Sequence, residues 1–375
     1  MDCAYFAAGR CRSCNRIATP YQAQLAAKQA HAQGLLSAWP AIQWLPAVAS
    51  SEAGFRNKAK MVVSGSREAP VLGILDEAGH GVDLAACPLY PPALQASFEP
   101  LRQFIQLARI PPYDLNSRRG ELKYLLLTLD EASGALMVRL VLRSREPEAR
   151  IRKHLPALLA ALPQAKVVSL NIQPEHKAVL EGELELVLSS DDSLTMTVAG
   201  LPLHLKPRSF FQVNSAVAGA LYTQAAAWVA EAQPREAWDL FCGVGGFALA
   251  AARLGVSVTG IEVSSEAIAS ASRSAAELGL AHARFRALDA TDFALAEQRV
   301  PELVIVNPPR RGIGAPLARF LDQSQCRTLI YSSCNAESLV RDLAAMSGFT
   351  PVAAQLLDMF PHTDHYELLL RCQRQ

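Results

Sequence analysis

The last 170 residues alternate short apolar runs with alanine-rich stretches that favour helices. Each apolar run is short enough for a buried strand and ends in glycine, acidic, amide or hydroxyl residues. Strands that alternate with helices in this way predict a doubly wound parallel sheet. The four predicted strands are 237–241, 256–261, 303–306 and 328–331. Two later runs, 352–357 and 366–372, are joined by a polar loop without a helix, so we expect an antiparallel hairpin at one edge of this sheet.

The region from about 40 to 200 has a different pattern, with strand-like runs and little intervening helix. Gly134 separates two of these runs and predicts a hairpin turn, and residues 147–162 have the pattern of a helix packed on the strands. A mixed α+β domain follows from this arrangement. Residues 20–38 form a separate helical stretch that Pro40 closes. The predicted strands of the mixed domain are 55–63, 121–129, 135–142 and 167–173.

Length and composition describe an ordinary folded chain. At roughly 100 to 200 residues per domain, 375 residues predict two or three domains. Half the residues are hydrophobic and 19% are charged, which excludes the composition of a disordered chain. No apolar run approaches the roughly 18 residues of a membrane helix, and the first residues lack the pattern of a signal peptide. We therefore expect a soluble cytoplasmic protein with no membrane partner.

The charge is unevenly distributed although the net charge is only +1. Residues 1–60 carry seven Lys or Arg against two acidic residues, and residues 101–154 carry eleven against six. These segments are where a polyanion such as RNA would bind, although arginines on a solvated surface give the same count. The candidate phosphate contacts are Arg118, Arg119, Lys123, Arg139, Arg143, Arg10, Arg12, Arg56, Lys58 and Lys60.

Four of the eight cysteines lie in the first quarter of the chain. Cys3, Cys11 and Cys14 form a C-x7-C-x2-C pattern, and Cys87 precedes a proline. In a reducing cytosol such thiols favour metal ligation over disulfides. Four thiolates can hold a zinc ion or an iron–sulfur cluster, and the lack of a second C-x2-C favours the cluster. Scattered thiols without a metal remain the alternative.

A glycine turn follows the first predicted strand of the parallel sheet and indicates a nucleotide site. Gly243 and Gly245 let a ligand approach the backbone, and Glu262 would lie at the tip of the next strand, where a carboxylate accepts hydrogen bonds from ribose. The turn also satisfies the dinucleotide pattern G-x-G-x-x-A. Asn307-Pro308-Pro309 after the third strand has no evident role with a dinucleotide, so S-adenosylmethionine fits better than NAD.

Several motifs together resemble one enzyme family. DLFCGVGGF, NPPRRG, YSSCN and DMFPHTDHYE are similar to the RNA uracil-C5 methyltransferases, and CAYFAAGRCRSC, FRNKAKMVVSG and CPLYP resemble their iron–sulfur branch that acts on 23S ribosomal RNA. The resemblance spans the chain from Cys3 to Glu367. It implies S-adenosylmethionine as methyl donor, a uracil of 23S ribosomal RNA as target, and a 4Fe-4S cluster on Cys3, Cys11, Cys14 and Cys87, with no obligate protein partner.

The resemblance also implies roles for individual residues. Cys334 matches the nucleophile and Glu367 the base that removes the C5 proton. The residues that match the S-adenosylmethionine contacts are Gln212, Phe241, Glu262 and Asn307. Relatives often have aspartate where this chain has Asn307, so we assign that residue to binding alone.

The same pattern implies three regions. Residues 1–40 would form the iron–sulfur segment, completed by Cys87, and residues 41–204 the mixed α+β domain that contacts RNA. Residues 205–375 would form a Rossmann-like class I methyltransferase domain of the α/β class.

The uracil ring explains why a cysteine and a base are needed. C5 is too weak a nucleophile to take a methyl group unaided, so a thiolate must first add at C6, and a base must then remove the C5 proton.

The sequence is also compatible with three other functions. These are an amino-group methyltransferase that uses Asn307-Pro308-Pro309, a redox iron–sulfur protein with a dinucleotide domain, and an RNA-binding module without catalysis.

Overall fold

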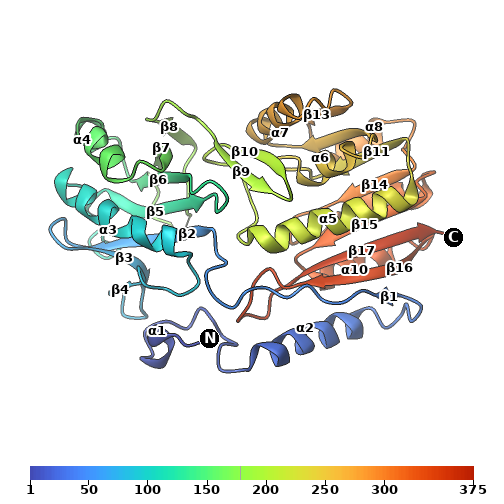
Figure 1. Cartoon of the computed structure of the whole chain (residues 1–375), viewed down its shortest axis with the longest axis horizontal. Helices are drawn as coiled ribbons and strands as arrows, with labels where there is room; N and C mark the ends of the chain where they lie inside the picture. The colour runs from blue at the N-terminus through green and yellow to red at the C-terminus, as the bar shows by residue number, and fades with distance from the viewer. Residues whose placement is uncertain (178) are drawn as a thin grey trace. The chain divides into compact units, whose positions relative to one another are not determined.

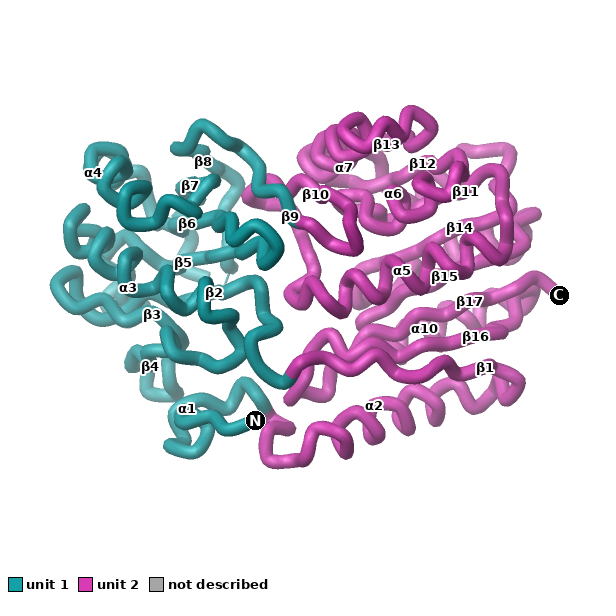
Figure 2. Tube along the Cα trace, viewed as in Figure 1, with its two compact units in different colours: residues 1–14, 52–196 teal, residues 15–51, 197–375 magenta. Residues whose placement is uncertain are grey.

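The computed structural model describes residues 1–177 and 179–375. Contacts divide the chain into two units (Figure 2): unit 1 comprises residues 1–14 and 52–196, and unit 2 comprises residues 15–51 and 197–375. This grouping differs from the three regions expected from the sequence, which are 1–40, 41–204 and 205–375. Residues 15–51 group with the C-terminal part of the chain. In the described residues, no helix is long and apolar enough to cross a membrane.

Unit 1 is built on a mixed sheet with strand order β4-β3-β2-β5-β6-β7-β8. Helices α3 and α4 lie on one face of this sheet (Figure 1), where Phe98, Phe104 and Ile151 pack against the strands. The four predicted strands and the predicted helix are confirmed, and β3, β4 and β8 extend the sheet. The strands are β2 (Lys58–Gly65), β3 (Pro70–Leu75), β4 (Gly81–Asp83), β5 (Leu122–Leu129), β6 (Leu136–Leu142), β7 (Ala165–Ile172) and β8 (Leu184–Val187). The helices are α1 (Ala4–Ala7), α3 (Pro92–Leu107) and α4 (Glu148–Ala161).

Unit 2 is a doubly wound sheet with strand order β1-β16-β17-β15-β14-β11-β12-β13. All neighbours from β15 to β13 are parallel, as predicted. The strands are β1 (Gln43–Trp44), β11 (Glu236–Leu240), β12 (Ser257–Glu262), β13 (Ala283–Ala287), β14 (Leu303–Val306), β15 (Thr328–Ser333), β16 (Phe349–Leu357) and β17 (Glu367–Arg374). A separate two-stranded sheet, β9 (Leu194–Val198) and β10 (Leu201–Leu205), lies between β8 and β11 in the sequence.

The predicted antiparallel hairpin is confirmed as β16 and β17, but its place at the edge of the sheet is wrong. β17 lies between β15 and β16, and β1 pairs with β16 in parallel on the outside. The two-residue strand β1 belongs to the segment 15–51, which also carries α2 (Tyr21–Leu35). A strand this short has no periodic pattern, which is why the sequence does not predict it.

Helices cover the sheet of unit 2 because its strands are apolar on both faces. Every residue of β14 is buried, as expected for a central parallel strand. Helices α2, α8, α9 and α10 contribute to one core cluster with side chains of the sheet. The other helices of unit 2 are α5, α6 and α7. The bounds are α5 (Ser215–Ala232), α6 (Gly246–Ala252), α7 (Ser265–Glu277), α8 (Ala290–Ala296), α9 (Gly314–Gln323) and α10 (Ala336–Ala344).

Candidate active site

The predicted site residues of unit 2 gather at the carboxyl edge of the parallel sheet. Phe241 follows β11, Glu262 ends β12, Asn307 follows β14 and Cys334 follows β15. β17 runs in the opposite direction, so its first residue, Glu367, lies at the same edge. Open α/β sheets bind ligands at this edge, where the strand order reverses between β11 and β14.

The glycine turn after β11 is held in a conformation that favours glycine. Gly243 and Gly245 have φ angles of 54° and 88°. A Cβ on Gly246 would lie 2.3 Å from the Tyr222 ring, so a side chain at that position is excluded. The backbone N–H of Gly243 donates to Glu262 Oε2 at 3.3 Å, which fixes the carboxylate across the turn. The turn therefore presents a backbone cradle beside an acidic side chain.

Asp239 is a functional candidate to which the sequence analysis assigned no role. It is fully buried in β11, and its Oδ2 accepts a hydrogen bond from the Ala248 N–H at 2.8 Å. Its Oδ1 has no hydrogen-bond partner among the described residues. Burial, together with the charge of Glu262, raises the pKa of Asp239 to about 8. A buried oxygen without a partner is costly, so a bound ligand that forms a hydrogen bond with Oδ1 would be stabilised there. The sequence signal for this residue is an acidic side chain in a buried strand four residues before Gly243.

Of the remaining predicted cofactor residues, Phe241 and Asn307 directly follow strands, and Gln212 lies shortly before a helix. Gln212 is 9% exposed and precedes α5, while Phe241 has a left-handed φ of 65°. The backbone N–H of Asn307 donates to the Leu240 carbonyl at 3.3 Å and joins the ends of β14 and β11. Val263, directly after Glu262, is 67% exposed and offers an apolar surface that the sequence analysis did not single out.

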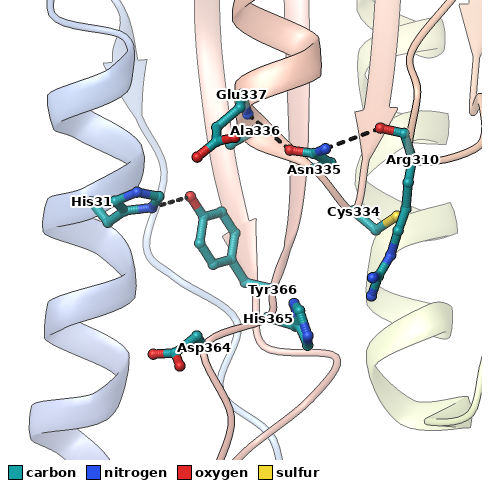
Figure 3. Close-up of a pocket in the computed structure, with 9 residues that line it drawn as sticks. All are labelled: His31, Arg310, Cys334, Asn335, Ala336, Glu337, Asp364, His365 and Tyr366. Carbon is teal, nitrogen blue, oxygen red and sulfur yellow. Dashed lines mark hydrogen bonds between the residues drawn. The ribbon is translucent and has the colours of Figure 1, made fainter.

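Cys334 is half-buried and lines a pocket of about 230 Å³. Figure 3 shows its sulfur beside the side chain of Arg310. Burial, followed by the charge of Glu367, raises the pKa of the Cys334 thiol, whereas Arg310 lowers it through its charge and a hydrogen bond. The arginine therefore favours the thiolate, the form that acts as a nucleophile.

Glu367 is 1% exposed and accepts a hydrogen bond from Ser332 Oγ at 2.6 Å. Burial raises the pKa of this carboxyl to about 7, and the Ser332 hydrogen bond opposes the rise only in part. A carboxyl with this pKa exchanges protons near neutral pH and suits a general base. Because β15 pairs with β17 at Ser333 and Leu368, the backbone brings the neighbouring Cys334 and Glu367 to one end of two adjacent strands.

The N-terminal cysteines lie in unit 1 near the segment that carries Cys87. The backbone N–H of Ala86 donates to the Tyr5 hydroxyl at 3.2 Å, which ties α1 to that segment. Burial, and next the charges of Cys87, Cys11 and Cys3, raise the pKa of the Cys14 thiol to about 11. Within residues 1–177 and 179–375, no group of three or more His, Cys, Asp or Glu side chains could hold a metal ion as placed. Metal ligation by these thiols thus stays a prediction.

Several basic residues expected at an RNA surface are engaged inside unit 1 instead. Arg139 is 2% exposed and pairs with Glu181 and Glu185, at 3.1 and 2.7 Å. Lys123 is buried and donates to the Glu175 carbonyl, and Arg143 pairs with a carboxylate. A buried, paired cation cannot reach a phosphate, so Arg139 and Lys123 are wrong as phosphate contacts. The candidates that remain exposed are Arg10, Arg12, Lys60, Arg118 and Arg119.

Comparisons with known proteins agree with this geometry. The family model of the tRNA (uracil-5-)-methyltransferases matches residues 20–374. The chain is 55% identical over 373 residues to the 23S rRNA (uracil(747)-C(5))-methyltransferase RlmC of Halothiobacillus neapolitanus, with 98% of each chain covered. It is 50% identical over 375 residues to RlmC of Escherichia coli O139:H28, with 100% of each covered. In fold it is similar to the Pyrococcus abyssi tRNA (uracil-54, C5)-methyltransferase in complex with S-adenosyl-L-homocysteine, with a TM-score of 0.80, 22% identity, and 96% of this chain and 85% of that chain covered.

Proposed function

Since the chain belongs to the tRNA (uracil-5-)-methyltransferase family, we propose that it methylates C5 of one uridine in 23S ribosomal RNA with S-adenosylmethionine. The target is the uridine that corresponds to uracil 747 in the names of its relatives. The observation that carries this proposal is the placement of Cys334 and Glu367 at the ends of two adjacent strands, at the edge that also bears the glycine turn. An amino-group methyltransferase would need neither a thiol nor a buried base there.

The residues at the carboxyl edge fit S-adenosylmethionine. A Cβ on Gly243 would meet no atom within 4 Å, so a ligand can approach the backbone there, and Glu262 offers carboxylate oxygens to ribose hydroxyls. Asp239 Oδ1, which has no hydrogen-bond partner among the described residues, suits a ligand that forms a hydrogen bond with it. Gln212, Phe241 and Asn307 complete the proposed binding set. When bound, the cofactor supplies an electrophilic methyl group.

Cys334 starts the reaction on the uracil ring. Its thiolate adds to C6, the C5–C6 π electrons move toward C4, and C5 becomes an enolate carbon that can take the methyl group. Arg310 stabilises the thiolate against the burial that raises the Cys334 pKa. A target base in folded RNA is stacked, so it must leave the stack to reach the thiol, at a cost of a few kcal/mol.

Glu367 completes the reaction after methyl transfer. C5 then carries both a hydrogen and the new methyl group, and the Glu367 carboxylate removes the proton. The electrons of the C5–H bond form the C5–C6 double bond, and the Cys334 sulfur leaves as thiolate. The pKa near 7 lets the carboxyl accept this proton and return it to solvent. Cys334 thus acts as nucleophile and Glu367 as base, and both side chains return to their starting ionisation states at the end of the cycle.

Modified-nucleotide mapping in cells tests the proposed function. In a strain that lacks the gene, 5-methyluridine should disappear from the single position of 23S rRNA that corresponds to uracil 747, and a wild-type copy should restore it. A copy with Cys334→Ala should not restore it although the protein accumulates. Persistence of 5-methyluridine at that position in the deletion strain would contradict the proposal.

We further propose that Cys3, Cys11, Cys14 and Cys87 hold a 4Fe-4S cluster in unit 1. The donor set fits such a cluster because four cysteine thiols are its usual ligands, and the hydrogen bond from the Ala86 N–H to the Tyr5 hydroxyl ties α1 to the segment near Cys87. The cluster has a structural role, since the proposed methylation needs no electron transfer. Its contribution would be to join residues 3–14 to the segment near Cys87.

Iron and sulfide analysis tests the cluster. Protein purified without oxygen should be brown and contain about four iron and four sulfide per chain, as expected for one such cluster. Cys14→Ser should lose most of the iron, whereas Cys372→Ser, which changes a buried cysteine of unit 2, should keep it. Zinc without iron in the wild-type protein would contradict the cluster and leave a four-thiolate zinc site.

The exposed arginines of unit 1 are the proposed RNA contacts. Arg118 and Arg119 lie together in the loop that precedes β5, and Lys60 is exposed on β2. Arg118 has a left-handed φ of 56°, and Gly120 follows it with 95°, so the loop has a defined turn and not an extended path. Exposed arginines in such a loop suit phosphate contacts.

A further inference from the structure

We propose that helix α2, together with Asn15 and Arg16 shortly before it, positions Glu367 for proton removal by holding the strap, defined as residues 358–366, which connects β16 to β17. This inference rests on the proposed function, in which Glu367 is the base. The strap and α2 both belong to unit 2. They are separated by more than 300 residues in the sequence, yet they are joined at three places by hydrogen bonds. In this arrangement Arg16, Gln24, Lys28 and His31 act as positioning residues.

The first anchor is a buried ion pair at the start of the strap. Lys28 Nζ donates to Asp358 Oδ1 at 2.7 Å and to the Phe360 carbonyl at 3.1 Å. The side chains of Lys28 and Asp358 are 5% and 0% exposed. The Tyr21 hydroxyl donates to the other oxygen of Asp358 at 2.9 Å. Both carboxylate oxygens and a strap carbonyl are thus fixed by residues of α2.

The second anchor holds the middle of the strap in an unusual conformation. His362 is fully buried and has a φ of 65°, in the left-handed region that a histidine seldom adopts. Its backbone N–H donates to Gln24 Oε1 at 2.9 Å, and Gln24 Nε2 lies 3.3 Å from its Nδ1. The His362 carbonyl accepts from the Arg16 N–H at 2.9 Å. Such a conformation persists where the surroundings hold it, as they do here.

The third anchor lies beside the catalytic pocket. Asn15 and Arg16 both donate to the carboxylate of Asp364, each at 2.6 Å. The Tyr366 hydroxyl is hydrogen-bonded to His31 Nδ1 at 2.8 Å, as Figure 3 shows. Asp364, Tyr366 and His31 line the same pocket as Cys334. The hydrogen bonds that fix the strap therefore include one to Tyr366, the residue directly before Glu367.

A role in positioning explains why the strap is held by polar groups. A buried ion pair is weak evidence for stability, because apolar residues of similar size often stabilise a fold as well or better. Hydrogen bonds, however, fix direction and register in a way that apolar contacts do not. A misplacement of about 1 Å can slow a catalytic step by about 100-fold. Glu367 begins β17 immediately after Tyr366, so a shift of the strap would reach its backbone.

A single-turnover experiment with two labels separates positioning from stability. RNA labelled with tritium at C5 of the target uridine reports proton removal, and a labelled methyl donor reports methyl transfer. In wild-type protein the two signals should rise together. In Arg16→Ala and in His31→Ala, tritium release should lag at least about tenfold behind methyl transfer, and an adduct that survives denaturation should accumulate. Loss of folded protein would lower both signals equally.

Three controls make the outcome decisive. Glu231→Gln removes an ion pair with Arg371 on β17 itself, away from the strap, and should leave the two signals together. The double variant Lys28→Met/Asp358→Leu replaces the buried ion pair without leaving a lone charge. This protein should fold, and its tritium release should lag behind methyl transfer. Glu367→Gln should show the largest lag. If it shows none, the proposed base is wrong. If it does and no strap variant does, the positioning role is overturned.

Discussion

We expect Cys334→Ala to abolish methylation, with a fall of at least about 10⁴-fold in rate, while the protein still binds RNA and S-adenosylmethionine. The size of the loss follows because the sulfur supplies the electrons that activate C5, and no neighbouring group replaces it. Binding persists because Cys334 lies after β15, apart from the glycine turn and Glu262. Methyl transfer is measured with labelled donor, and binding by gel shift and calorimetry on the same preparation.

A second cysteine provides the matched control. Cys326 precedes β15 and is fully buried, with a weak contact from its sulfur to the Thr328 carbonyl at 3.2 Å. Cys326→Ala should reduce stability slightly and leave the rate within about twofold. Full turnover by Cys334→Ala would remove the nucleophile from the mechanism. Equal losses in both variants would mean that the fold, and not the thiol, was affected.

Glu367→Gln should stop the reaction after methyl transfer and convert most of the enzyme into a protein–RNA adduct. Glutamine keeps the size of the side chain and can still accept the hydrogen bond from Ser332, so the fold should persist. It cannot take the C5 proton, and the Cys334 sulfur therefore cannot leave. Overall turnover should fall by about 10³-fold, within the range of general-base catalysis. Denaturing gels with labelled RNA measure the adduct directly.

The wild-type pH profile tests the same residue without a substitution. Burial places the Glu367 pKa near 7, and the group acts as a base only when ionised. Proton release from a preformed methylated adduct should therefore rise with pH, be half-maximal near pH 7 and level off above it. Because burial also raises the Cys334 pKa, the adduct-forming step should rise further at alkaline pH. A rate of proton release that falls as pH rises from 6 to 8 would contradict the assignment.

The sequence predicts the site better than it predicts the surroundings. The buried run of β14 and the glycine turn after β11 have short-range signals, and the rule that ligands bind at strand ends places Glu262, Asn307 and Cys334 together. The antiparallel strand that brings Glu367 to that edge follows from the hairpin pattern. These features depend on local periodicity and on one general rule of α/β topology.

Long-range polar pairing is what the sequence does not reveal. Arg139 looks like a surface cation until the fold brings Glu181 and Glu185 beside it. Lys28 looks like a solvent-exposed helix residue, yet it is buried against Asp358, 330 residues away. The two-residue strand β1 is too short for any pattern. In each case the partner lies far along the chain, and only the three-dimensional arrangement decides which charges are paired.

The most direct test of the covalent mechanism is to identify the residue bonded to the RNA. RNA with 5-fluorouridine at the target position should form a stable adduct in the presence of S-adenosylmethionine, because fluorine at C5 cannot be removed by the base. After digestion, mass spectrometry should find the pyrimidine on the peptide that contains Cys334 and on no other. Attachment to a different residue, or methylated product without any adduct, would contradict the account.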